Sequence, residues 1–241
     1  MSESNEDAIV TTQRRAAIAI IWINRPDVLN AISLAVKAAL IAAVEAADQD
    51  ADIGAIVLAG KGRAFSAGAD RNLLAELDNA GPRQRREWLE LGAQVTQAML
   101  HSETPIIAAV QGFTVGGGLS LALAADIVLA AEGTVFFIPE VELGLPYLWG
   151  STPMLAASLG LHRARNLVLS CDRFSAEDAE QWGLVRRIVP APQLMPEAEK
   201  LAERLAAMPR HAMAAQKRLN NRLALRYTAW LEDEISLAFD E

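Results

Sequence analysis

Apolar runs and segments of helical period alternate along the first part of the chain. Residues 18–23, 53–59 and 105–110 form short apolar runs that predict buried strands. Between the first two runs, residues 34–47 carry apolar side chains at helical spacing, and Ser33 precedes them as the expected N-cap. A strand, a helix and a second strand in this order predict parallel pairing through a right-handed crossover, which is an α/β arrangement.

The rest of the chain is mainly helical in pattern. Helices are predicted over 88–100, 119–131, 154–159, 164–169, 176–182, 196–207, 213–222 and 224–239. Residues 135–138 and 185–189 are expected as short extended segments. Residues 79–86, which include glycine, proline and three arginines, are expected as a mobile loop over the entrance to a site. The arginines fit a solvated surface better than a phosphate clamp, although both interpretations stay open.

Composition and charge exclude several classes of protein. The chain has 241 residues, of which 52% are hydrophobic, so one large domain or two small ones with a sizeable core are expected. A net charge of −8 and the lack of a basic run argue against nucleic acid as a partner. Asp126 interrupts the longest apolar stretch, so no membrane span is expected, and the acidic residues 1–7 are unlike a signal peptide. The single Cys171 fits a reducing compartment, and we expect a cytoplasmic protein.

Two common kinds of catalytic site have no signature in the sequence. His101, His162 and His211 lie far apart and lack metal-ligand spacing, so no metal is expected. The chain contains no Gly-x-Ser-x-Gly segment, which leaves a serine hydrolase with little support.

A glycine triplet at 116–118 lies between the predicted strand 105–110 and the predicted helix that follows it. The first N–H groups of a helix have no intrahelical partner and lie at the positive end of its dipole. An anion or a developing oxyanion would suit these donors. Alternatively, the glycines merely allow the strand and the helix to pack closely.

A second run of small residues, 66–69, bares the backbone just before another predicted helix at 73–77. Asp70 is expected to cap that helix with its side chain. Because this run also follows a strand of the same expected sheet, the N–H groups of Ala69 and Gly117 could together form a two-donor oxyanion hole. The sequence permits this pairing without requiring it.

Glu140 is the one acidic residue in the otherwise apolar run 137–141. A carboxylate in apolar surroundings is costly to ionise, so its pKa is expected to rise, as a general acid or base requires. The alternative is that Glu140 simply points to solvent.

Four motifs follow one another along the chain. They are Asn24-Arg25-Pro26 with Asn30-Ala31, Ala64-Phe65-Ser66-Ala67-Gly68-Ala69-Asp70, Gly112 with Gly116-Gly117-Gly118, and Pro139-Glu140. In this order and at these separations they resemble the crotonase (enoyl-CoA hydratase/isomerase) superfamily over about residues 18–190. The resemblance implies a crotonase-like spiral of ββα units over residues 1–190 and a helical trimerisation region over 191–241. It also implies a homotrimer or a dimer of trimers.

The resemblance further implies a coenzyme A thioester as the substrate, so that coenzyme A is part of the substrate and no separate cofactor is expected. The backbone N–H groups of Ala69 and Gly117 would hold the thioester oxygen, and Glu140 would carry protons. The loop 25–29 and the backbone around Ala67 would line the coenzyme A site. The residues expected at the substrate are Arg25, Val28, Leu29, Ala67, Gly68, Asp70, Gly116 and Ser120.

Ser120 is the most informative departure from the family pattern. Hydratases of the family carry two glutamates, one matching Glu140 and one two positions after the glycine triplet, where this chain has Ser120. A double-bond isomerase needs a single base, so Glu140 alone favours enoyl-CoA isomerisation. Hydration stays open because Glu142 or a bound water could compensate. Other reactions of this scaffold and a non-catalytic acyl-CoA-binding subunit also stay open. The aromatic residues of 145–150 are expected either as a wall of the acyl pocket or as core.

Overall fold

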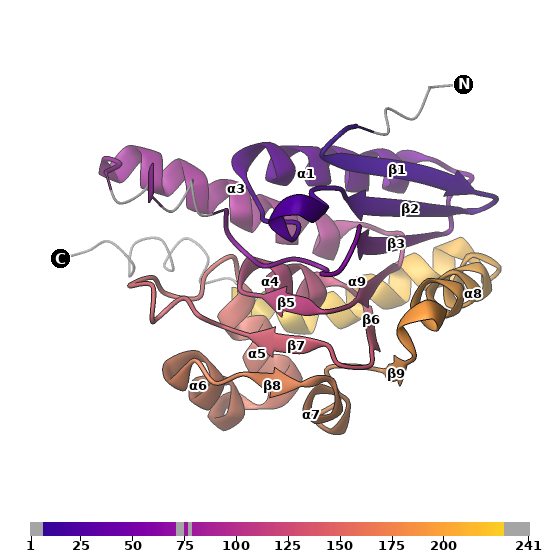
Figure 1. Ribbon diagram of the computed structural model, residues 1–241. Coiled ribbons are helices and arrows are strands. Elements are labelled where there is room, and N and C mark those ends of the chain that lie inside the picture. Colours follow the sequence, from indigo (N-terminus) through magenta and orange to yellow (C-terminus); the bar gives the residue numbers. More distant parts are fainter. Residues whose placement is uncertain (1–6, 71–74, 77–78, 229–241) are drawn as a thin grey trace.

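Six strands form the main sheet, in the order β1-β2-β3-β4-β6-β9 (Figure 1). The computed structural model describes residues 7–70, 75–76 and 79–228. The strands are β1 (Val10–Arg15), β2 (Ile18–Ile23), β3 (Ala55–Gly60), β4 (Ile106–Val110), β6 (Ile127–Ala131) and β9 (Arg187–Val189). β1 pairs antiparallel with β2, and every other pair in this sheet is parallel. The expected α/β fold with parallel crossovers is confirmed.

The central strands are apolar throughout because helices cover both faces of the sheet. In β2, Ile21 and Ile23 belong to the core cluster shared with α1 (Leu34–Gln49). Ile18 and Ile20 alternate with them and belong to the cluster shared with α8 (Leu194–Ala206). Ser33 caps α1 as expected, since its side chain accepts a hydrogen bond from the backbone N–H of Val36 at 3.3 Å.

A second, three-stranded sheet carries the region of the glycine triplet. Its strands are β5 (Phe113–Val115), β7 (Val135–Phe137) and β8 (Phe174–Ser175). Gly112, with φ +61°, turns the chain from β4 into β5, and its carbonyl accepts a hydrogen bond from the N–H of Val135. α4 (Gly117–Ala124) follows β5 directly (Figure 1). The first residues of α4 therefore lie at the junction of the two sheets.

The remaining helices complete the molecule. They are η1 (Pro26–Val28), α3 (Pro82–His101), α5 (Ser151–Leu159), α6 (Leu161–Ser170), α7 (Ala176–Gln181), η2 (Ala191–Gln193) and α9 (Arg210–Thr228). None of the helices in the described ranges is long and apolar enough to cross a membrane. α8 packs on strands of the main sheet and shares their core. The division between residues 1–190 and 191–241 stays a prediction.

The predicted helix over 119–131 is wrong. α4 ends at Ala124, and the chain enters β6 at Ile127. Asp126 marks the change, because its carboxylate accepts a hydrogen bond from the N–H of Ile106 at 2.8 Å and pairs with Lys217 at 2.8 Å. Apolar residues on both sides of Asp126 do not distinguish a buried helix from a buried strand, so the sequence pattern gave no boundary here.

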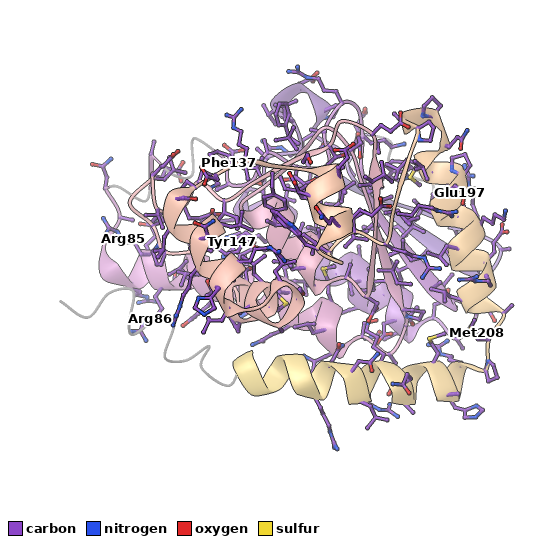
Figure 2. The ribbon with its side chains drawn as sticks, turned by 90° about the horizontal axis from the view of Figure 1, so that it is seen from below. Arg85, Arg86, Phe137, Tyr147, Glu197 and Met208 are labelled. Atoms are coloured by element: carbon purple, nitrogen blue, oxygen red, sulfur yellow. The ribbon has the colours of Figure 1, made fainter. Side chains whose placement is uncertain are left out.

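The loop expected over 79–86 is also wrong from Pro82 onward. α3 begins at Pro82, a position that proline favours because the first helical N–H needs no partner. The arginines of this segment lie on the first turns of α3, where Arg83 pairs with Glu87 at 2.9 Å on an exposed surface. Figure 2 shows Arg85 and Arg86 at the outer end of that helix.

The two helices expected over 213–222 and 224–239 form a single helix as far as the structure describes them, since α9 continues to Thr228. The residues after 228 lie outside the described ranges.

Candidate active site

The loop after β3 crosses over the start of β5 and is fixed to it by backbone hydrogen bonds. The N–H of Ser66 donates to the carbonyl of Phe113 at 3.0 Å, and the N–H of Val115 donates to the carbonyl of Ser66 at 3.0 Å. This pairing brings Gly68 against the start of α4. A Cβ on Gly68, whose φ is +85°, would lie 2.8 Å from the carbonyl oxygen of Val115 and 3.7 Å from the nitrogen of Gly117. Only glycine allows so close an approach.

The two backbone N–H groups expected as an oxyanion hole lie at this junction. Gly117 is the first residue of α4, so its N–H has no helical acceptor. Ala69 forms a parallel bridge with Ile32, but the N–H groups used there belong to Ile32 and Asp70. Within the described residues, neither the N–H of Ala69 nor that of Gly117 has a backbone acceptor. Two free donors thus come from segments nearly fifty positions apart in the chain.

Asn30 fastens the loop that precedes α1 to the loop that carries Ala69. Its Oδ1 accepts a hydrogen bond from the N–H of Arg25 at 2.8 Å. Its Nδ2 donates to the carbonyls of Lys61 at 2.8 Å and Ala64 at 2.7 Å. Asn30 is fully buried with φ +57°, a left-handed conformation that asparagine tolerates better than most residues. This explains why asparagine occupies the position.

Replacing Asn30 by alanine is expected to lower the free energy of unfolding by about 2–4 kcal/mol. The change removes the partner of the half-buried N–H of Arg25 and of the carbonyls of Lys61 and Ala64, of which only the contact with Ala64 is fully buried. Each unsatisfied buried group costs about 1–3 kcal/mol, part of which solvent recovers at the half-buried contacts. Denaturant unfolding would measure the effect. Asn79→Ala is the matched control, because the side chain of Asn79 donates to the carbonyl of Ala75 in an exposed contact. Equal stability of the two variants would contradict the role given to Asn30.

Arg25 and Asp70 form an ion pair between the same two loops, with Nη1 and Oδ2 2.7 Å apart. Arg25 also donates to the carbonyl of Ala31 at 2.6 Å. The helix that Asp70 was expected to cap falls partly on residues outside the described ranges, so this expectation is not tested. Val28 and Leu29, also expected at the substrate, lie in and after η1, where the side chain of Val28 is exposed. The surface beside Ala67 and Gly68 is therefore formed by the loop 25–30.

Glu140 lies against the backbone of the glycine triplet. A Cβ on Gly116, whose φ is +50°, would lie 2.4 Å from Oε1 of Glu140. Oε2 is shielded from solvent and has no hydrogen-bond partner among the described residues. Burial raises the pKa of Glu140 to about 7. The alternative that Glu140 points to solvent is wrong, because β7 and the turn after it direct the carboxylate inward to the residue before Gly117.

Ser120 lies one turn into α4 and takes part in a buried group of hydroxyls. It donates to the phenol oxygen of Tyr147 at 3.3 Å and accepts from the hydroxyl of Ser151 at 2.6 Å. Burial, followed by the negative charge of Glu140, raises the pKa of Tyr147 well above its usual range, so this side chain stays a neutral phenol. The side chain of Tyr147, labelled in Figure 2, is buried. The position at which the resemblance implies a second glutamate for a hydratase is thus occupied by Ser120, which belongs to a neutral hydroxyl cluster.

Tyr147 and Ser151 were not predicted as site residues. Tyr147 belongs to the aromatic segment that was expected either as a pocket wall or as core; its side chain is buried and contacts Ser120, which agrees with core packing, and the role as a pocket wall stays a prediction. Ser151 carries no signal in the sequence, because nothing local shows that the first residue of α5 faces α4. Glu142, considered as a substitute acid, is exposed on the turn after Glu140.

Comparison with known proteins assigns the architecture that holds these groups. The family model described as enoyl-CoA hydratase/isomerase matches residues 13–239. The chain belongs to the enoyl-CoA hydratase/isomerase family. This family acts on acyl-CoA thioesters. The chain is therefore an enzyme of the general class that acts on acyl-CoA thioesters.

Relatives in this family carry hydratase names. A probable mitochondrial enoyl-CoA hydratase of Dictyostelium discoideum is 34% identical over 214 residues, which are 88% of this chain and 74% of the relative. The 2,3-dehydroadipyl-CoA hydratase of Escherichia coli is 35% identical over 211 residues, which are 88% of this chain and 80% of the relative. The crystal structure of an enoyl-CoA hydratase/isomerase from Mycobacterium paratuberculosis has a TM-score of 0.89 and 31% identity, covering 95% of this chain and 92% of that one. The crotonase fold is thereby confirmed.

Proposed function

We propose that this member of the enoyl-CoA hydratase/isomerase family shifts the double bond of an enoyl-CoA, with Glu140 as its only proton carrier. One observation carries the proposal. The Glu140 carboxylate lies against Gly116, next to the free N–H of Gly117, whereas Ser120 joins a neutral hydroxyl cluster. Asp70 is paired with Arg25 and Glu142 is exposed, so neither of these acids stands in for a second catalytic glutamate.

The reaction follows from the position of these groups. The thioester oxygen accepts hydrogen bonds from the N–H groups of Ala69 and Gly117, which acidifies C2 of a 3-enoyl-CoA. The Glu140 carboxylate takes a proton from C2, and the electron pair moves onto the thioester oxygen to give a dienolate. The same carboxyl group then returns the proton to C4, and the double bond forms between C2 and C3. One proton leaves and one returns, so no water is consumed.

The substrate-binding roles are proposals as well. Arg25, Val28 and Leu29 line the surface beside Ala67 and would contact the coenzyme A portion of the substrate. The proposed double-bond shift would need no separate cofactor and no metal. A homotrimer or a dimer of trimers is proposed for the assembly.

The pH dependence should report the single base. Because burial raises the pKa of Glu140 to about 7, kcat/KM for a 3-enoyl-CoA should rise with pH through about 7 and then level off. If kcat/KM instead rises with pH near 4.5, the ordinary pKa of glutamate, a different carboxylate acts as the base. Initial rates from pH 5 to 9, at constant ionic strength, measure the profile.

Hydration is the second candidate, and the hydratase names of the relatives favour it. Product analysis by mass separates the two reactions, since hydration adds one water and isomerisation adds nothing. The proposal expects a 3-enoyl-CoA to become a 2-enoyl-CoA of equal mass, and a 2-enoyl-CoA to gain no water. A hydrated product would overturn it. Binding of both esters without any reaction would favour a non-catalytic acyl-CoA-binding subunit.

A further inference from the structure

The indole of Trp149 lies in a slot between two glycines on different helices. A Cβ on Gly92 of α3 would lie 1.9 Å from its Nε1, and a Cβ on Gly117 of α4 would lie 2.7 Å from its ring carbon Cη2. No other residue type fits at either glycine while the ring stays in place. Trp149 is only 5% exposed. The ring is thus packed on the residue whose N–H is proposed to hold the thioester oxygen.

The backbone of Trp149 adopts an uncommon conformation to place the ring there. Its φ is +67°, and a bulky residue in the left-handed region is an outlier that the surroundings must maintain. Its carbonyl accepts a hydrogen bond from the hydroxyl of Thr96 at 2.8 Å. Trp88 packs edge-on against the indole, with the ring centroids 6.1 Å apart. Strained residues of this kind gather at functional sites, where the strain serves a purpose.

Lys37 supports the ring from the side of α1. Its amino nitrogen lies 3.8 Å from the ring centroid of Trp88 and 4.5 Å from that of Trp149, and it donates to the carbonyl of Trp88 at 3.0 Å. The side chain is fully buried. Burial lowers the pKa of Lys37 to about 6. Lys37 and Trp88 thus lie against the Trp149 indole in addition to Gly92 and Gly117.

We propose that Trp149 closes the acyl end of the site, so that the protein selects thioesters with short acyl chains. The proposal rests on the proposed function, in which the thioester oxygen is bound at Gly117. An acyl chain that starts there passes the Glu140 carboxylate at C2 and C4. Acyl carbons beyond C4 that lie on the Gly117 side would meet the indole of Trp149. Gly92, Gly117, Trp88 and Lys37 all pack against this ring. A long chain would have to displace a ring that α1, α3 and α4 all fix.

The test is the binding of saturated CoA thioesters, which cannot react by either proposed chemistry. Dissociation constants for acetyl-, butyryl-, hexanoyl- and decanoyl-CoA would be measured by calorimetry on the wild type, Trp149→Ala and Trp149→Phe. In an open apolar pocket each added CH₂ tightens binding roughly fourfold. The affinity of the wild type should not increase beyond butyryl-CoA. Decanoyl-CoA should bind at least about tenfold more weakly than butyryl-CoA, whereas an open apolar pocket would bind it more tightly. Trp149→Ala should reverse the order, and Trp149→Phe should fall between them.

Trp182→Phe is the matched control, because Trp182 lies after α7 and packs on Phe174, away from Gly117. Its chain-length preference should equal that of the wild type. Decanoyl-CoA binding as tight as butyryl-CoA in the wild type, or an unchanged ratio in Trp149→Phe, would overturn the proposal. If Trp149→Ala does not fold, Trp149→Phe decides. Absence of binding for every thioester would instead refute the proposed function, and loss of isomerase activity alone would leave the chain-length proposal standing.

Discussion

Glu140→Gln is expected to lower kcat for a 3-enoyl-CoA by roughly 10²–10⁴-fold, the usual contribution of a positioned acid or base. Glutamine has almost the same shape, so it keeps the packing against Gly116 but cannot take a proton from C2. Binding of a saturated acyl-CoA should change little, because the N–H groups of Ala69 and Gly117 are unaffected. The measurement is the rate of the double-bond shift under saturating substrate.

Glu142→Gln is the matched control for that variant, since Glu142 is exposed on the same turn. It should keep the wild-type rate. A fast Glu140→Gln variant, or a slow Glu142→Gln variant, would show that the base has been assigned to the wrong residue.

The same variant has a stability signature. The pKa of Glu140 in the folded protein, about 7, is above the ordinary value of 4.5, so the folded state binds the proton more tightly than the unfolded chain. The contribution of this group to stability is fully present below about pH 4.5 and is lost as the pH rises through about 7. Glu140→Gln should lack this decline. Chemical denaturation at pH 5 and pH 8 would compare the two proteins.

Gly116→Ala is expected to lower kcat by about 10²-fold or more, which is the effect of misplacing reacting groups by about 1 Å. The added Cβ would lie 2.4 Å from Oε1 of Glu140, so the carboxylate must move. The left-handed φ of +50° also becomes unfavourable, and its relaxation would turn the N–H of Gly117 away from the thioester. KM should change less than kcat, since the coenzyme A surface is not altered.

Gly133→Ala is the control that distinguishes the effect of backbone strain from the effect of the contact with Glu140. Gly133 has a φ of +75°, and a Cβ there would meet nothing within 4 Å. Both variants lose stability because both positions have a positive φ, by roughly 1–2 kcal/mol or more, and thermal unfolding measures the loss. Only Gly116→Ala should lose activity. Equal loss of activity in both would mean that backbone strain, and not the contact with Glu140, is responsible.

The sequence predicts the parallel sheet well because strands buried on both faces read as continuous apolar runs. β2 and β4 are recovered nearly to the residue. β1 escapes prediction, since its residues are polar and mostly exposed at the edge of the sheet. The boundary between α4 and β6 escapes for the opposite reason, because both elements are mostly apolar and only Ala125 and Asp126 separate them.

The site is only partly readable from the chain. The glycines before α4 and the apolar surroundings of Glu140 carry local signals, and the structure brings Glu140 to Gly116. The approach of Gly68 to Gly117 depends on hydrogen bonds between loop and strand that no local pattern encodes. The slot of Trp149 needs Gly92 and Gly117 together, and Gly92 reads in the sequence as an ordinary helix position.

The most direct test of the central claim follows one proton. A 3-enoyl-CoA carrying deuterium at C2 is incubated in ordinary water with the wild-type protein, and the product is analysed by mass and NMR. If one carboxyl group, shielded from solvent, carries the proton from C2 to C4, the product is a 2-enoyl-CoA without added water. Part of the deuterium should then be found at C4. Addition of water to the product, or the same transfer of deuterium by Glu140→Gln, would contradict the account.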